Sequence, residues 1–201
     1  MEIQIIWLAP AAALLLGYLL GSIPFGVLLT RWGGAGDVRQ IGSGNIGATN
    51  VLRTGRKGLA AGTLVLDALK GVAAVLIVSR FAPGDEPLAA AGAFLGHCYP
   101  IWLRFRGGKG VATLLGIALA LHWPVGLVYA AVWLGTLALL RVSSLAGMLA
   151  ALSAPVAAAF FERFDLVLLF LSLALILLWK HGENIERLLA GTEPRVGKSR
   201  A

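Results

Sequence analysis

A polar, glycine-rich stretch at residues 41–53 interrupts an otherwise apolar chain, and its residue types suit an oxyanion such as phosphate. We expect Gly42, Gly44 and Gly47 to allow positive φ values and to bring several backbone N–H groups to one point. The side chains add neutral hydrogen-bond donors and one forked cation, which are Ser43, Asn45, Thr49, Asn50 and Arg53. The simpler interpretation is a flexible connector between two helices.

A second stretch, residues 104–113, combines glycine and cations in a similar way. Lys109 supplies a point charge, and its neighbours Gly107, Gly108 and Gly110 would let a ligand approach the backbone closely. If this stretch faced the first one, the two would form a pocket for one phosphate or for two.

The third stretch of this kind begins at His181 and contains Asn184, Arg187 and Glu193. Both His181 and His97, which precedes the second stretch, can exchange a proton near neutral pH. The alternative for each histidine is a structural residue with satisfied hydrogen bonds. For Arg187 and Glu193, binding a ligand and fixing the tail are equally open.

The composition indicates what kind of elements must position these residues. Of 201 residues, 58% are hydrophobic and 13% are charged, which is typical of a polytopic membrane protein. We expect an all-α integral membrane protein with one domain over residues 1–201 and a mobile basic tail at 190–201. The expected membrane-spanning helices number seven, at residues 3–30, 58–80, 88–103, two within 110–140, 145–161 and 166–179.

Several residues should interrupt these helices. Gly21 and Pro24 are expected to kink or open the first helix, which we take to be retained because no basic leader of a signal peptide precedes it. Residues 122–124 should separate the two helices within 110–140, of which the first is too short to span a membrane alone.

The basic residues predict the orientation of the chain. With seven spans, one face receives a crowd of cations: Arg31, Arg39, Arg53, Arg56, Lys57, Arg104, Arg106, Lys109, Arg141, Lys180 and Arg187. The other face receives Arg80 and Arg163. Because positive residues favour the cytoplasmic side, the N-terminus is expected outside and the C-terminus in the cytoplasm. The three polar stretches would then share the cytoplasmic side.

Two ionisable residues fall inside an expected span. Asp67 and Lys70 are three residues apart and so share one helical face, where a mutual ion pair facing the interior is favoured over direct chemistry. Cys98 is the single cysteine, so there is no internal disulfide, and it is expected to be a small buried side chain. The three histidines show no zinc-binding spacing, and no metal site is expected.

Other functions suggested by single features are not supported. The net charge of +7 does not indicate a nucleic-acid-binding protein, because the cations sit between apolar runs and no recognition motif accompanies them. The spacing of Gly42, Gly44 and Gly47 fits a dinucleotide fingerprint, but no βαβ unit surrounds it. Lys109 lacks the following Ser or Thr of a nucleotide-binding P-loop.

Taken together, the polar stretches resemble the three signatures of the bacterial acyl-phosphate glycerol-3-phosphate acyltransferase family (PlsY). The matching blocks are Gly42-Ser-Gly-Asn-Ile-Gly-Ala-Thr-Asn-Val-Leu-Arg53, Gly96-His97 with Phe105-Arg-Gly-Gly-Lys-Gly-Val-Ala-Thr113, and His181-x-x-Asn-Ile-x-Arg-Leu-x-x-Gly-x-Glu193. Gly21-Ser-Ile-Pro-Phe-Gly26 and Leu66-Asp-x-Leu-Lys-Gly71 are also similar to that family, although Gly182 stands where relatives often carry Arg.

The resemblance implies a seven-span enzyme of the bacterial inner membrane with its active site facing the cytoplasm. It would transfer a fatty acyl group from acyl phosphate to the sn-1 hydroxyl of glycerol 3-phosphate, giving lysophosphatidic acid and inorganic phosphate. This is the first acylation of phospholipid synthesis. The implied partners are these two substrates, membrane lipid and the enzyme that makes acyl phosphate, and no cofactor is implied.

On this interpretation, Ser43, Asn45, Thr49 and Arg53 bind a phosphate together with Lys109 and the backbone of Gly107 and Gly108. His181 and Asn184 contact the reacting head groups, while His97, His181 or a substrate phosphate accepts the proton. Ser143 and Ser144 are weaker candidates. A transporter for phosphate or an organophosphate is the competing function, but the expected outer turns offer few polar residues for it. A non-catalytic scaffold would leave the three polar stretches unexplained.

Overall fold

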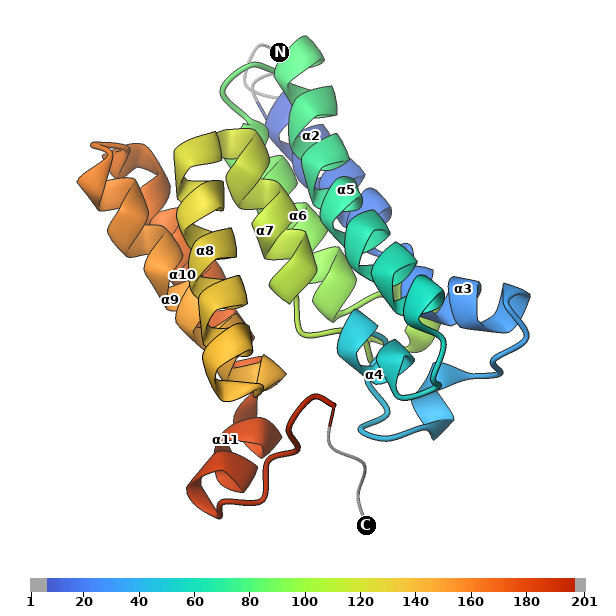
Figure 1. The fold of residues 1–201 in the computed structure, drawn as a ribbon. Coiled ribbons are helices and arrows are strands. Elements are labelled where there is room, and N and C mark those ends of the chain that lie inside the picture. The colour runs from blue at the N-terminus through green and yellow to red at the C-terminus, as the bar shows by residue number, and fades with distance from the viewer. Residues whose placement is uncertain (1–6, 198–201) are drawn as a thin grey trace. The chain divides into compact units, whose positions relative to one another are not determined.

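The computed structural model describes residues 7–197, and every regular element in that range is a helix (Figure 1). The chain divides into two compact units, unit 1 at residues 1–121 and unit 2 at residues 122–201. The helices of unit 1 are α2 (Leu8–Gly21), α3 (Phe25–Trp32), η1 (Val38–Gln40), α4 (Ala48–Leu52), α5 (Lys57–Phe81), α6 (Glu86–Cys98), η2 (Ile101–Leu103) and α7 (Val111–Leu121). The helices of unit 2 are α8 (Trp123–Leu140), α9 (Ser143–Phe160), α10 (Phe164–Lys180) and α11 (Gly182–Leu189).

Long apolar helices make this chain an integral membrane protein. Among the described residues, four segments are long and apolar enough to cross a membrane: Leu8–Trp32, Lys57–Phe81, Trp123–Leu140 and Ser143–Phe160. A fifth results if α10 and α11, which meet at a bend of 63°, count as one broken span. The expected all-α membrane fold is confirmed, whereas the count of seven spans stays a prediction.

The first span is broken where the sequence predicts a break. α2 ends at Gly21, and α3 begins at Phe25, after Pro24. Proline has no backbone N–H and its ring disfavours a helical conformation in the preceding residue, so the helix stops before it. From the backbone, the Ile23 carbonyl then receives a short-range bond from the Phe25 N–H (3.1 Å) instead of the normal helical one.

Small residues bring the backbones of α2 and α6 into direct contact. A Cβ atom added at Gly17 or Gly21 would overlap backbone atoms of Ala89 or Ala93, and one added at Gly92 or Gly96 would overlap the backbone of α2. α5 and α7 approach each other in the same way at Gly71 and Gly116. Close backbone approach is how helices gain packing energy where lipid weakens the hydrophobic drive.

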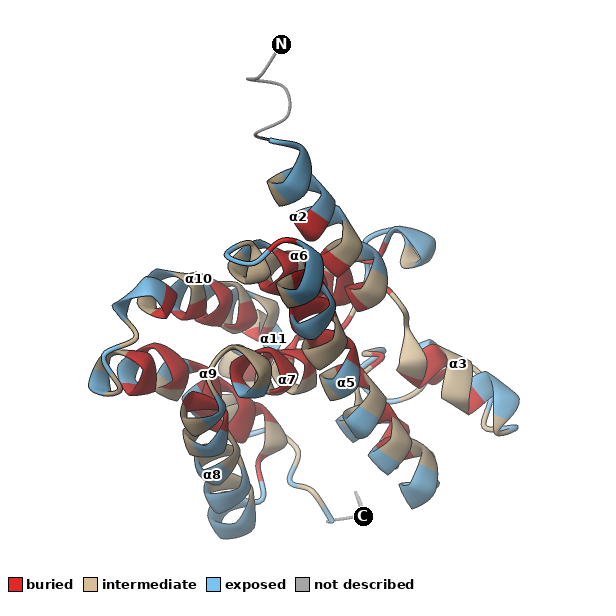
Figure 2. Cartoon of the chain, turned by 90° about the horizontal axis from the view of Figure 1, so that it is seen from above, coloured by how far each residue is buried: buried red, intermediate tan, exposed pale blue. Residues whose placement is uncertain are grey.

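The helices of unit 2 differ in how deeply they are buried. α9 has buried residues along most of its length, including the internal Pro155, and it packs between α8 and α10. Much of α8 is exposed (Figure 2), and its exposed residues include large apolar ones such as Leu139. An apolar surface of this kind suits lipid contact.

Most of the expected helix boundaries are close to those observed. The pair within 110–140 is found as α7 and α8, separated at His122 as predicted, and α7 is indeed short. The expected helix at 88–103 is wrong at its end, because α6 stops at Cys98 ahead of Pro100 and only the short η2 follows. Residues 3–6 of the first expected span lie outside the described residues.

Candidate active site

The glycine-rich stretch of unit 1 is a loop shaped by the side chain of Asn50. This side chain is buried, and its Nδ2 donates to the backbone oxygens of Val38 (2.9 Å), Ile41 (2.9 Å) and Asn45 (2.8 Å). Its Oδ1 accepts from the Ser43 N–H at 3.2 Å. Asn50 therefore holds the loop from within, which differs from the expectation that it binds a ligand.

The loop glycines act differently from one another. Gly42 (φ 58°) and Gly44 (φ 69°) have the expected positive φ, but Gly47 does not, because its φ is −79° at the start of α4. At Gly42 a Cβ would also crowd the side chains of Asn50 and Arg53. The conformation thus requires glycine at two of the three positions.

Several backbone N–H groups of this loop are already used inside it. Gly44 N–H donates to the Ile41 oxygen (3.0 Å), and Gly47 N–H donates to Oδ1 of Asn45 (3.0 Å). With the Ser43 N–H bound to Asn50, the expected convergence of these amides on a ligand is not found. What the loop presents outward are exposed side chains: Ser43, Thr49 and Arg53.

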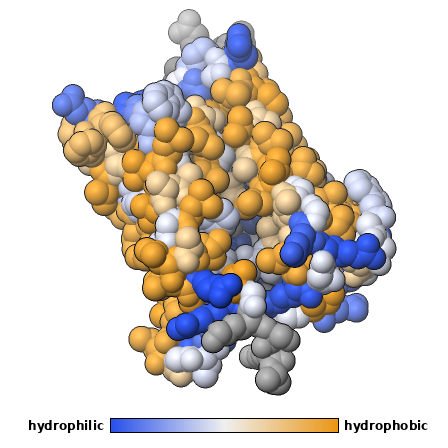
Figure 3. All heavy atoms as spheres, in the orientation of Figure 1, coloured by the Kyte–Doolittle hydropathy of each residue, from blue (hydrophilic) through white to orange (hydrophobic). Residues whose placement is uncertain are grey.

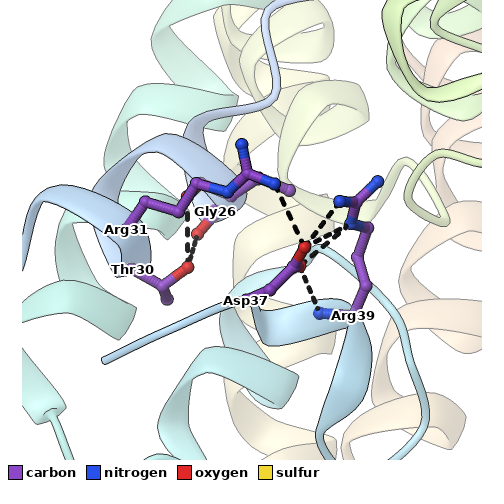
Figure 4. A network of polar contacts seen from close by, with 6 residues as sticks. Gly26, Thr30, Arg31, Asp37 and Arg39 are labelled. Atoms are coloured by element: carbon purple, nitrogen blue, oxygen red, sulfur yellow. Dashed lines mark hydrogen bonds and ion pairs between the residues drawn. The ribbon is translucent and has the colours of Figure 1, made fainter. Parts of the chain in front are cut away.

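An ion-pair network centred on Asp37 stabilises the segment that leads into the loop. Asp37 caps η1 by accepting from the Arg39 N–H (3.0 Å), and its carboxylate also binds the guanidinium groups of Arg39 and Arg31 (Figure 4). The hydrogen bonds from Arg39, helped by Arg31, hold the pKa of the Asp37 carboxyl well below its usual range. Asp37 is not among the residues predicted from the sequence, although an Asp two residues before an Arg at the start of a helical turn is a recognisable signal.

The first polar stretch of unit 1 packs on an apolar cluster that Leu103, just before the second stretch, also contacts. Val27, Val38, Ile46, Val51 and Ala60 are buried together, and Leu103 of η2 packs against them. In Figure 1 the segment between η2 and α7 and the helix α4 both lie toward the lower end of unit 1, and Figure 3 shows hydrophilic surface gathered there. The first and second polar stretches therefore lie at the same end of this unit.

The second stretch is bound to the end of α6. Gly107 N–H donates to the Cys98 oxygen (3.1 Å), and Gly108 N–H donates to the His97 oxygen (3.0 Å). These carbonyls belong to the last turn of α6, where no helical N–H can reach them. Both N–H groups thus donate within the protein, and the expectation that they bind phosphate stays a prediction.

The glycines of this stretch are needed for close packing. A Cβ at Gly108 would overlap Nε2 of His97, and a Cβ at Gly110, whose φ is 87°, would overlap the Phe94 ring. Lys109 is half-buried between these fixed points and stands two residues before Val111, the first residue of α7. The positive end of the α7 dipole adds to the charge of Lys109 there, which favours an anion.

The ionisable residues inside unit 1 form the expected ion pair. Lys70 Nζ lies 2.7 Å from Oδ1 of Asp67, and both side chains are 3% exposed. Nδ1 of His97 lies 3.6 Å from the same oxygen, and His97 is also buried. Cys98 is buried, as predicted.

In unit 2, His181 occupies the corner between α10 and α11. Its Nδ1 lies 2.8 Å from the Leu177 oxygen. Because a carbonyl oxygen can only accept, Nδ1 carries a hydrogen, and a neutral ring therefore keeps its lone pair on Nε2. This tautomer is the one that could take up a proton at Nε2.

The remaining residues of the third stretch converge on Glu193. Its carboxylate accepts from Nδ2 of Asn184 (2.6 Å), Nε of Arg187 (2.7 Å) and Oγ of Ser144 (2.7 Å). Burial, the largest influence, opposes ionisation, but these three donors together hold the pKa of Glu193 below its usual range. Glu193 and Arg187 thus fix the tail to α9 and α11.

The tail is held at one further point, since Val196 N–H donates to the Arg141 oxygen at 2.7 Å. The mobility expected for residues 190–201 stays a prediction, and residues 198–201 lie outside the described residues. The bond between Ser144 and Glu193 leaves no signal in the sequence, because the two residues are 49 positions apart.

The fold and these residues define a class of protein: a helical integral membrane protein whose exposed cationic loops suit phosphorylated ligands. A model of the glycerol-3-phosphate acyltransferase family matches residues 11–191. The glycerol-3-phosphate acyltransferase of Mesorhizobium japonicum is 60% identical over 185 residues, which are 92% of this chain and 95% of that protein. The enzyme of Erythrobacter litoralis is 58% identical over 190 residues, covering 94% and 96% of the two chains.

Solved structures agree with these relatives. The glycerol 3-phosphate form of PlsY (YgiH), an integral membrane glycerol 3-phosphate acyltransferase, matches with a TM-score of 0.88 and 36% identity over 94% of this chain and 96% of that one. Its lysophosphatidic acid form matches with a TM-score of 0.85 and 35% identity, covering 94% and 95% of the two chains. The chain therefore belongs to the glycerol-3-phosphate acyltransferase family, and the resemblance seen in its sequence is confirmed.

Replacing Asn50 by Asp tests the role of its amide. The change keeps the size of the side chain but turns a donor toward three backbone oxygens into a negatively charged acceptor. We expect acyltransferase activity to fall about 100-fold because the loop is displaced, with helical content unchanged. Initial rates and circular dichroism measure this. Gln40→Glu, the same exchange at an exposed neighbouring position, is the matched control, and equal activity of both variants would contradict the role.

Replacing Glu193 by Gln tests the network in unit 2. The pKa of Glu193 is lowered from its ordinary value of 4.5, so its stabilising contribution is present above about pH 4.5 and is lost as the pH falls through the folded value. At pH 7 we expect Glu193→Gln to melt roughly 3–10 °C below the wild type. The difference should close on acidification, whereas a widening difference would refute this account. Glu183→Gln, at a mostly exposed carboxylate, is the control.

Proposed function

We propose that this protein transfers a fatty acyl group from acyl phosphate to the sn-1 hydroxyl of glycerol 3-phosphate. The oxygen of that hydroxyl attacks the acyl carbonyl carbon, the carbon–oxygen bond to phosphate breaks, and lysophosphatidic acid and inorganic phosphate leave. The proton of the hydroxyl passes to a base or to a phosphate oxygen. Membership of the family supports glycerol 3-phosphate as the acyl acceptor. The cationic, glycine-containing loops support an acyl donor that itself carries phosphate.

The observation that carries this proposal is the gathering of polar and cationic side chains at one end of unit 1. Ser43 and Arg53 are exposed on a loop that is shaped from within, and half-buried Lys109 lies at the same end of the unit. A guanidinium group can bind a phosphate with two hydrogen bonds, and a lysine contributes a strong point charge. Thr49 and Asn45 belong to the same loop and are proposed to assist.

Acyl phosphate needs little activation. It is a mixed anhydride with a good leaving group, so no covalent intermediate on the protein is required. Holding the hydroxyl near the carbonyl and stabilising the charge on the oxyanion and on the departing phosphate can supply the rate. Arg53 and Lys109 are proposed to provide that charge stabilisation.

His181 and Asn184 are proposed to contact the reacting head groups. The hydrogen on Nδ1 of His181 leaves Nε2 as the atom that would accept the proton. Asn184 has one amide hydrogen bond to Glu193, which would fix the direction of the rest of its side chain. The acyl chain would lie among the apolar helices.

A transporter for phosphate or an organophosphate is not favoured, because the relatives and the matched structures are acyltransferases. A product assay separates the two functions. Purified protein given long-chain acyl phosphate and glycerol 3-phosphate should release phosphate and form lysophosphatidic acid in equal amounts, and glycerol should be a poor acceptor. A protein that only transports would form no product.

Within that assay, Lys109→Ala should reduce turnover about 100- to 1000-fold, because one cationic contact to the transition state is lost. The folded yield should be unchanged. Lys57→Ala removes an exposed lysine at the start of α5 and is the control. Near-normal turnover of Lys109→Ala would reject its role.

We also propose that the chain crosses the inner membrane seven times, with its N-terminus outside and its active site facing the cytoplasm. The crowding of basic residues on one expected face supports this orientation. Native Cys98 is buried, so cysteines introduced at Arg56, Glu186 and Pro83 would report accessibility. A membrane-impermeant maleimide should label Arg56→Cys and Glu186→Cys in inside-out vesicles and Pro83→Cys in intact spheroplasts. Labelling of Arg56→Cys and Glu186→Cys from opposite sides would contradict the topology.

A further inference from the structure

Unit 1 contains a buried ionic cluster below its exposed loops, formed by Asp67, Lys70 and His97. Each of the three residues is at most 5% exposed. A single carboxylate oxygen, Oδ1 of Asp67, lies 2.7 Å from Lys70 Nζ and 3.6 Å from His97 Nδ1. Burying charge in a membrane protein is costly, so a cluster of this kind needs a purpose that apolar packing would not serve.

One arm of the cluster reaches the break in the first span. Lys70 Nζ donates to the Ile23 oxygen at 2.9 Å and lies 5.8 Å from the centre of the Phe25 ring. The Ile23 carbonyl lies at this break and lacks a normal helical partner, because the Val27 N–H donates to the Pro24 oxygen instead (3.0 Å). Lys70 therefore satisfies the backbone at the point where α2 gives way to α3.

The other arm reaches the segment that carries Lys109. The His97 ring turns Nδ1 toward Asp67, while Nε2 lies against the Gly108 backbone so closely that a Cβ there would overlap it. The His97 carbonyl also accepts from the Gly108 N–H. The position of the His97 ring thus determines where Gly108 and its neighbour Lys109 can lie.

We propose that Asp67 is a positioning residue of the acyltransferase, which orients His97 and thereby sets the place of Lys109, while Lys70 balances its charge and anchors the break in the first span. This inference rests on the proposed role of Lys109 in acyl transfer. The separation of 3.6 Å exceeds a hydrogen bond, but an adjacent carboxylate still favours a hydrogen on the ring nitrogen that faces it.

Removing one charge and then both separates positioning from stability. Asp67→Asn leaves Lys70 as an unbalanced buried cation, so it should lower the melting temperature and the folded yield. Adding Lys70→Met removes that cation, and we expect the double variant to regain most of the lost melting temperature. Its turnover should nevertheless stay at least about 10-fold below that of the wild type, because His97 has lost the group that orients it.

A purely structural ion pair predicts the opposite for the double variant, namely that turnover returns together with stability. Wild-type turnover in a stable double variant would therefore overturn the inference. Asp165→Asn in α10, which removes an exposed carboxylate paired with Arg163, is the matched control and should keep its turnover within about twofold of the wild type.

A second measurement needs no variant of the cluster. The chain has three histidines, so wild-type protein labelled with ¹⁵N in its histidine rings gives three sets of ring signals. His122→Gln and His181→Gln assign two of them, and the third belongs to His97. We expect His97 to carry a hydrogen on Nδ1, and a hydrogen on Nε2 alone would overturn the inference. If wild-type protein formed no lysophosphatidic acid, the proposed function would fail, while this ring measurement would still test the orientation of His97.

Discussion

Backbone groups that leave regular helices must find partners inside the protein when the surroundings are apolar, and this constraint accounts for the polar interior of unit 1. Lys70 donates a hydrogen bond to the carbonyl of Ile23 at the broken first span. Asn50 donates to three backbone carbonyls around the first loop. The amides of Gly107 and Gly108 donate to carbonyls in the last turn of α6. Each irregular segment is therefore bonded to the helices near it.

The same constraint separates the residues that build the site from those that can bind. Glycine is required in both loops of unit 1 because side chains and carbonyls occupy the space where a Cβ would lie, as at Gly42 and Gly108. Their backbone amides are largely used within the protein. We therefore propose that a phosphorylated ligand binds the side chains of Ser43, Arg53 and Lys109, which suits a reaction that depends on charge stabilisation and placement.

The sequence could predict what depends on neighbouring residues. Long apolar runs revealed the helices, Pro24 the break in the first span, and the three-residue spacing of Asp67 and Lys70 their ion pair. It could not predict contacts made by tertiary packing. The use of the Gly107 and Gly108 amides by α6, and the bond between Ser144 and Glu193, join residues that only the folded chain brings together.

The central claim is that Ser43, Arg53 and Lys109, rather than the glycine backbone, hold a substrate phosphate. An experimental structure of this protein in lipid with glycerol 3-phosphate bound tests it most directly. The account predicts phosphate oxygens within hydrogen-bonding distance, about 3 Å, of at least two of these three side chains. A phosphate bound elsewhere, with all three side chains turned away from it, would contradict the account.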